Sequence, residues 1–203
     1  MTVVARFKNR ISIVLKNGDL LKVIFQSFLL IFASEMGDKT QLLALVLTSR
    51  YKKPWTIMAG IFAATLLNHA AASWAGGWIS GFFDRRILSF ILSGIFFVFA
   101  AWILIPDKDE DLHKSCRYGV FLTTLCAFFI AEMGDKTQLA TIALGAQFRS
   151  PLFVTIGTTA GMLAADGIAV FLGDRLTQKI SLKWIRVGAC LLFAAFGLGI
   201  LLY

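Results

Sequence analysis

Six apolar runs, each long enough to cross a bilayer, constrain the fold of this 203-residue chain more than any other feature. A bilayer core about 30 Å thick is crossed by a helix of about 20 apolar residues. Only helices and closed barrels satisfy their backbone hydrogen bonds there. The sequence therefore predicts an all-α integral membrane protein with six transmembrane helices, at about residues 23–48, 54–80, 87–105, 119–146, 151–173 and 184–203.

The composition argues against a soluble protein. Hydrophobic residues make up 58% of the chain and charged residues 16%, whereas soluble domains average about 45–50% and about 25%. The net charge of +8 does not indicate a nucleic-acid partner, because Lys and Arg lie in short segments between the apolar runs. We therefore expect the lipid bilayer as a partner and no nucleic acid.

An internal repeat divides the chain into two halves. The eight residues from Glu35 to Leu42 recur unchanged from Glu132 to Leu139, 97 residues later. Each half contains three predicted helices, and an odd number of crossings makes the second half enter the membrane from the opposite side. The predicted organisation is two inverted three-helix repeats, residues 23–105 and 119–203, joined by an acidic and polar linker at residues 106–118.

The charges outside the apolar runs bear on topology. The loops on the linker side hold more Lys and Arg than the loops on the other side, which favours a cytoplasmic linker. The basic tail at residues 1–22 adds positive charge to the opposite side. Its mixture of apolar and basic residues fits an interfacial helix on an anionic surface, and it lacks the long apolar segment of a cleaved signal peptide.

The repeated motif places acidic side chains near the middle of two apolar runs. A carboxylate is costly inside a membrane and indicates a functional site by default. On a continuous helix, a spacing of three residues puts the acids and the following Gln on one face. We expect the two polar faces to meet at the repeat interface, with the four carboxylates within about 10 Å of one another. The predicted metal ligands are Glu35, Asp38, Gln41, Glu132, Asp135 and Gln138.

Further motif residues suit this site. Thr40 and Thr137 add hydroxyl oxygens, which together with carboxylate and amide oxygens favour a hard divalent cation. Gly37 and Gly134 permit a close helix approach or local unwinding between the two acids.

Two lysines partly neutralise the four motif carboxylates. One divalent cation or two protons would balance the remaining charge, and competition between them is a basis for cation/proton exchange. Lys39 and Lys136 each follow a Glu by four residues. On a continuous helix Lys39 would pair with Glu35 and Lys136 with Glu132, locking the unloaded or closed state.

The two halves differ at one informative position. His69 and Asp166 are equivalent residues in the second helix of each half. Either can relay protons or complete the metal shell. For His69 a packing role is equally well supported, whereas for Asp166 the functional role is favoured.

The duplicated Glu-Met-Gly-Asp-Lys-Thr closely resembles the hallmark of the GDT1 family of membrane cation transporters, also described as uncharacterised protein family 0016. That hallmark is Glu-x-Gly-Asp-(Lys/Arg)-(Thr/Ser) in each of two three-helix repeats, and the resemblance covers about residues 24–203. It implies an antiporter that exchanges Mn²⁺ or Ca²⁺ for protons and has no cofactor beyond the transported ion. The metal ligands implied are Glu35, Asp38, Glu132 and Asp135. Bacterial members resemble manganese exporters, and the short loops and the lack of a transit peptide make this chain resemble a bacterial inner-membrane member. We therefore expect Mn²⁺ export across a bacterial inner membrane.

Three alternatives stay open. A Ca²⁺/H⁺ antiporter with Mn²⁺ as secondary substrate would use overlapping ligand chemistry. A passive divalent-cation channel would carry a flux independent of an opposing proton gradient. An intramembrane aspartyl protease would carry the motif Gly-x-Gly-Asp, but Glu35 and Glu132 stand where its first Gly should be. The neighbouring Lys residues would also disturb a pair of aspartates that shares a proton. We therefore expect a transporter rather than an enzyme.

Overall fold

The computed structural model describes residues 17–105, 119–172 and 182–202, and these residues are helical apart from short connections. The predictions for most of the basic tail and for the linker lie outside this described part. The described helices are α2 (Asn17–Glu35), α3 (Lys39–Tyr51), α4 (Pro54–Ile79), the short 3-10 helix η1 (Ser80–Phe82), α5 (Arg85–Trp102), α6 (Gly119–Glu132), α7 (Lys136–Phe148), α8 (Pro151–Leu172) and α10 (Leu182–Leu202).

Several of these helices are long and apolar enough to cross a membrane. Among the described residues, four spans pass on length and hydropathy: α4 with η1, α5, α8 and α10. The pair α2 and α3 passes only when taken together, and α6 is a shorter apolar helix. The all-α membrane class is therefore confirmed. The exact arrangement of six spans in inverted repeats stays a prediction.

The continuous helices expected at residues 23–48 and 119–146 are wrong, because each run breaks inside the motif. The first run ends one helix at Glu35 and starts the next at Lys39, with a bend of 72° between α2 and α3. Gly37 and Gly134 have φ angles of 82° and 80°. Only glycine adopts this left-handed conformation at little cost, so the motif glycines allow the break.

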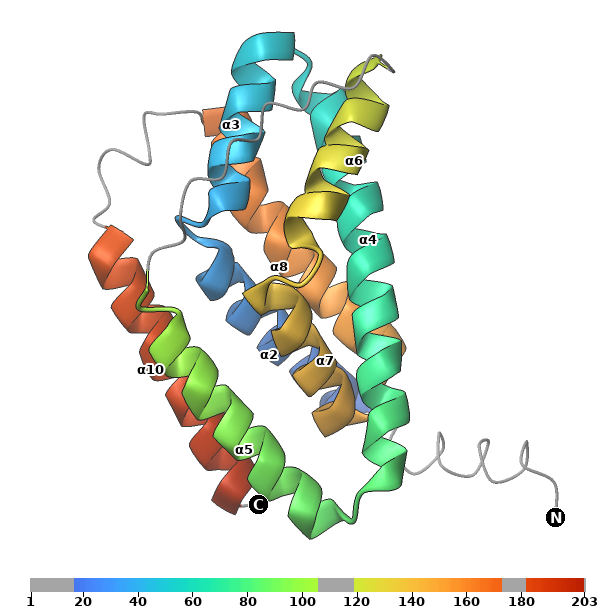
Figure 1. The fold of residues 1–203 in the computed structure, drawn as a ribbon, viewed down its shortest axis with the longest axis vertical. Helices are drawn as coiled ribbons and strands as arrows, with labels where there is room; N and C mark the ends of the chain where they lie inside the picture. The colour runs from blue at the N-terminus through green and yellow to red at the C-terminus, as the bar shows by residue number, and fades with distance from the viewer. Residues whose placement is uncertain (1–16, 106–118, 173–181, 203) are drawn as a thin grey trace, which may run out of the picture.

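Helices of both broken pairs pack against α4 and α8. Helix α4 packs against α6, α7 and α8, while α2 packs against α8. Helices α5 and α10 form a separate pair along one side (Figure 1). The two breaks lie near the middle of the bundle's long axis in this view.

Two close helix crossings occur at equivalent positions of the two halves. A Cβ atom built on Gly60 would lie 2.7 Å from Thr124 Cβ, and one built on Gly157 would lie 2.8 Å from Ser27 Cβ. Gly60 and Gly157 are 97 residues apart, and so are Ser27 and Thr124. In the centre, Thr65 Oγ1 lies 3.3 Å from Met162 Sδ, a contact between two residues that are themselves 97 positions apart. Small residues at such crossings let membrane helices approach closely.

Candidate metal and proton site

Each motif forms a tight turn between two helices, and a glutamine side chain holds the turn. The Gly37 N–H donates to Gln41 Oε1 at 2.8 Å, and the Gly134 N–H donates to Gln138 Oε1 at 2.7 Å. Gln41 Nε2 also donates to the Ala165 carbonyl at 2.6 Å, which ties the first turn to α8. Both glutamines predicted as metal ligands therefore contact the backbone of their own turn.

Three carboxylates converge at the two breaks. Glu35, Glu132 and Asp135 each place one oxygen within 4.8 Å of the others. Both glutamates are fully buried, and Asp135 is 9% exposed. Thr40 Oγ1 donates to Glu35 Oε2 at 2.7 Å, and Thr137 Oγ1 donates to Glu132 Oε2 at 3.0 Å. We call these three acids the carboxylate cluster.

The other oxygen of each glutamate is available to a ligand. Among the described residues, Oε1 of Glu35 and Oε1 of Glu132 are buried without a hydrogen-bond partner. Buried polar atoms are normally paired, so an unpaired carboxylate oxygen indicates a place for a proton or a cation.

The expected pairing of Lys39 with Glu35 is wrong. Lys39 Nζ instead lies 3.2 Å from Asp135 Oδ1 in the other half of the chain. The i, i+4 geometry requires a continuous helix, and the turn at Gly37 removes it because Lys39 begins a new helix. This ion pair joins the two halves at the site.

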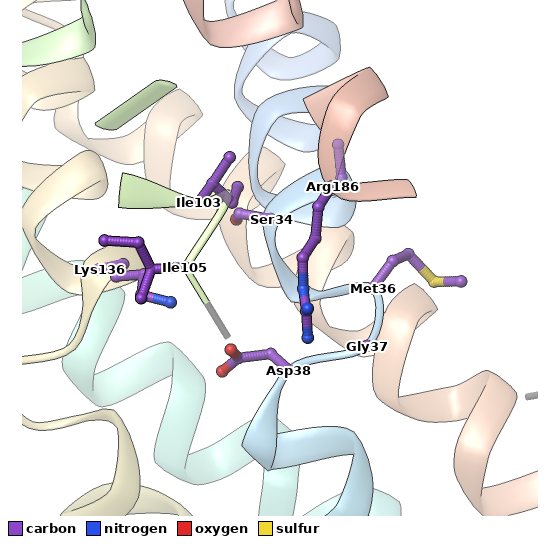
Figure 2. Close-up of a pocket in the computed structure, with 9 residues that line it drawn as sticks. Ser34, Met36, Gly37, Asp38, Ile103, Ile105, Lys136 and Arg186 are labelled. Atoms are coloured by element: carbon purple, nitrogen blue, oxygen red, sulfur yellow. The ribbon is translucent and has the colours of Figure 1, made fainter. Parts of the chain in front are cut away.

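Asp38 and Lys136 line a small cavity next to the carboxylate cluster. The cavity has a volume of about 10 Å³, which is about the space of one water molecule. Figure 2 shows the Asp38 and Lys136 side chains with Arg186 of α10 and the Gly37 turn around this cavity. Asp38 acts electrostatically on Glu132 but contributes no oxygen to the carboxylate cluster. Lys136 Nζ lies 6.0 Å from the centre of the Trp102 ring.

Arg186 is the residue near the site that sequence reasoning missed. Its charge belongs to the linker-side basic residues that favour a cytoplasmic linker, and we predicted no role for it at the site. The available signal was its position inside the run predicted to form the last helix. A basic residue in a membrane span indicates a functional site in the same way as an acidic one.

Asp166 and His69 are fully buried on neighbouring helices. Within the described part of the chain, neither Asp166 oxygen nor either His69 ring nitrogen has a hydrogen-bond partner. Asp166 lies within electrostatic range of both Glu35 and Glu132. The site thus gathers a fourth buried carboxylate from α8 beside the carboxylate cluster.

Comparison with known proteins bears on what this site does. The family model described as "Divalent cation/proton antiporter GDT1" matches residues 23–111 and 120–203. A protein of Vibrio cholerae named "Putative manganese exporter" is 45% identical over 167 residues, which cover 82% of this chain and 84% of the relative. A GDT1-like protein of Synechocystis is 28% identical over 202 residues, covering 87% of this chain and 95% of its own. GDT1-like protein 5 of Arabidopsis thaliana is 27% identical over 224 residues, covering 91% and 97%.

No solved structure matches the chain. The family match nevertheless spans both halves and both copies of the motif, and the described helices are those of a membrane protein. The protein is therefore a member of the GDT1 family of divalent cation/proton antiporters, a membrane transporter and not an enzyme.

Proposed function

We propose that this protein exports Mn²⁺ in exchange for protons and binds the ion at the carboxylate cluster. The meeting of Glu35, Glu132 and Asp135 in the interior carries the proposal. An ion about 2.1–2.6 Å from each oxygen keeps its ligands within about 4.2–5.2 Å of one another. The oxygens of the cluster all lie within 4.8 Å of one another, close enough to share one divalent cation.

Exchange follows from competition for the same oxygens. The free Oε1 atoms of Glu35 and Glu132 can take protons or share a metal ion, but one oxygen cannot do both. Lys39 neutralises Asp135 while the metal is absent, which favours the unloaded state. Asp166 adds a ligand or a proton relay, and His69 offers a further relay. Thr40 and Thr137 orient the two glutamates.

Alternating access follows from the asymmetry between the two halves. In this state Asp135 belongs to the carboxylate cluster, while its equivalent Asp38 lies beside Lys136 in the small cavity. We propose that the opposite-facing state exchanges these roles, so that Asp38 joins the cluster and Lys136 takes the place of Lys39. The corresponding crossings at Gly60 and Gly157 support an inverted repeat that makes this exchange possible.

Manganese is the proposed substrate because the Vibrio cholerae relative carries that description. Because that relative is bacterial, we also propose that the protein lies in a bacterial inner membrane. The ligand chemistry alone also fits Ca²⁺, so a Ca²⁺/H⁺ antiporter is the second candidate.

The test is flux in proteoliposomes with Mn²⁺ and Ca²⁺ in competition. We expect Mn²⁺ flux to depend on an opposing proton gradient and to exceed Ca²⁺ flux. The variants Glu35→Gln, Asp38→Asn, Glu132→Gln and Asp135→Asn should nearly abolish transport, whereas Asp19→Asn, an exposed acid of α2, should retain it.

Three results would contradict parts of the proposal. Retained transport in any two of the four motif variants would exclude the shared site. Flux without any dependence on the proton gradient would indicate a channel. Preferred Ca²⁺ transport would select the second candidate.

A further inference from the structure

A second, larger cavity lies between α2, α5, α7 and α10, and none of the motif residues line it. Its volume is about 820 Å³, within the range of about 300–1,000 Å³ typical of small-molecule sites. The lining residues come from the end of the bundle where α2 and α5 begin and where α7 and α10 end. Figure 1 shows the α5 and α10 pair running beside α2 and α7 there. This space is far larger than a transported ion needs.

The charged side chains that line the cavity are all basic within the described part of the chain. Lys22, Arg85 and Arg149 line it, and no acidic side chain does so among the described residues. Arg149 Nη2 donates to the Ser80 carbonyl at 3.0 Å, which anchors a guanidinium that has further donors. Lys22 Nζ lies 3.7 Å from Asp19 Oδ1, but both side chains are largely exposed. Ion pairs between exposed side chains are weak. The positive charge attracts an anion and opposes the passage of a divalent cation.

The remainder of the cavity is largely apolar. Phe25 and Leu29 line it from α2, and Leu192 and Phe196 line it from α10. The Phe196 ring contacts the Phe148 ring of α7 with 5.8 Å between ring centres, which forms a wall between the two helices. The ligand that fits therefore has an anionic head and an apolar body.

We propose that this cavity binds one anionic glycerophospholipid, with its phosphate near Arg85 and Arg149 and an acyl chain along α10. Basic pockets between transmembrane helices are suited to anionic lipid headgroups. Phe25 is 63% exposed and Lys22 is largely exposed, so the mouth of the cavity is accessible from outside the helices. Inorganic phosphate would satisfy the basic residues but leave the apolar walls uncovered.

The test uses the purified full-length protein in detergent, titrated with phosphatidylglycerol or phosphatidylcholine of the same chain composition and followed by native mass spectrometry. Phosphatidylglycerol should bind more tightly. Arg85→Gln and Arg149→Gln should each weaken its binding about fivefold, the effect of one cation near a lipid phosphate. Arg86→Gln is the matched control, because Arg86 is the exposed neighbour of Arg85 and does not line the cavity.

A second pair of variants tests the apolar part. Gly199 lines the cavity, and a Cβ atom built there meets no atom within 4 Å, so Gly199→Leu should fill the space and abolish phosphatidylglycerol binding. Gly188→Leu is the control on the same helix, because Gly188 is equally open but lies outside the cavity. The Arg85 and Arg149 variants still decide the outcome if Gly199→Leu fails to fold.

Several results would overturn the lipid site. These are equal binding of the two lipids, an Arg86→Gln effect as large as that of Arg85→Gln, unchanged binding in folded Gly199→Leu, and displacement of the lipid by millimolar inorganic phosphate. None of these measurements requires transport, so they leave the proposed export function to its own test.

Discussion

Lys39 supplies a tethered cation to the site at which we propose that a free metal ion binds. Its ammonium lies 3.2 Å from Asp135, so an incoming metal must displace it or bind against its charge. We expect Lys39→Gln to tighten Mn²⁺ binding by at least about tenfold, the lower range for close charge pairs. Turnover should fall, because the unloaded state loses its counter-ion.

Calorimetric titration with Mn²⁺ and proteoliposome flux check this prediction for Lys39. Lys53→Gln, an exposed lysine before α4, is the control and should change neither measurement. An unchanged Mn²⁺ affinity in Lys39→Gln would show that the ion pair does not compete with the metal.

Asp166 and His69 allow a comparison between equivalent positions. Both are fully buried, but Asp166 lies within electrostatic range of the two glutamates of the cluster. Asp166→Asn should therefore reduce Mn²⁺ transport more than His69→Ala, measured in proteoliposomes at matched protein content. Equal and mild losses would assign both residues to packing.

At the scale of single residues, the sequence predicted which polar side chains are buried better than it predicted which residues they contact. A carboxylate in an apolar run must lie in the protein interior, which is where Glu35, Glu132 and Asp166 lie. The partner of Lys39 could not be predicted, because it comes from the other half of the chain. The spacing of four residues favoured Glu35 as the partner of Lys39, and only the tertiary structure brings Asp135 close to Lys39.

Among the helices, the broken motif segments differ most from expectation. Spacings of three residues fit a continuous helix, and a single glycine is tolerated inside one. From the sequence, unwinding at Gly37 and Gly134 is expected only as an alternative to a close helix approach. In each turn the glutamine four residues further on accepts the glycine N–H, a local hydrogen bond that the apolar periodicity does not encode.

The conformation of Gly134 can be tested by one substitution. A Cβ atom there meets nothing within 4 Å, so the cost of Gly134→Ala comes from its φ of 80° alone. We expect a loss of about 1–2 kcal/mol in the free energy of unfolding, measured by chemical denaturation in detergent. Transport should also fall, because Asp135 follows directly.

Gly94→Ala is the matched control for Gly134→Ala. Gly94 lies inside α5 with equally open space and helical geometry, so alanine should stabilise the protein by up to about 1 kcal/mol. Equal effects of the two substitutions on the free energy of unfolding would mean that the left-handed conformation of Gly134 is not needed for stability.

If the two halves are equivalent, substitutions at corresponding positions should change the stability of the whole molecule by similar amounts. Gly60 and Gly157 sit at corresponding crossings where a methyl group would collide with a neighbouring helix. Gly60→Ala and Gly157→Ala should each lower the free energy of unfolding by about 1–3 kcal/mol, the usual cost of overpacking. Gly167→Ala is the control, because its nearest contact would be Met58 Cε at an ordinary 3.6 Å.

Chemical denaturation in detergent measures the two crossing variants and the Gly167→Ala control. A large loss at only one of the two crossings would contradict their structural equivalence. A loss at Gly167→Ala as large as at the crossings would mean that close packing does not explain the effect.

Apolar runs predicted where several helices lie but not how they pack. Helices α4, α5, α8 and α10 each begin within a few residues of the expected positions. The pairing of α5 with α10 could not be predicted, because hydropathy assigns a segment to the membrane without giving its neighbours. The basic cavity that this pair encloses with α2 and α7 was unforeseen for the same reason.

The ion pair between Lys39 and Asp135 has a consequence for how such a molecule could have arisen. Each half of the chain carries only part of the proposed binding site, so an ancestral protein with a single motif would have needed a second copy to enclose an ion. If the halves are inverted as we propose, the two copies would also have needed opposite orientations in one membrane. Fusion after gene duplication supplies both orientations from one gene in equal amounts.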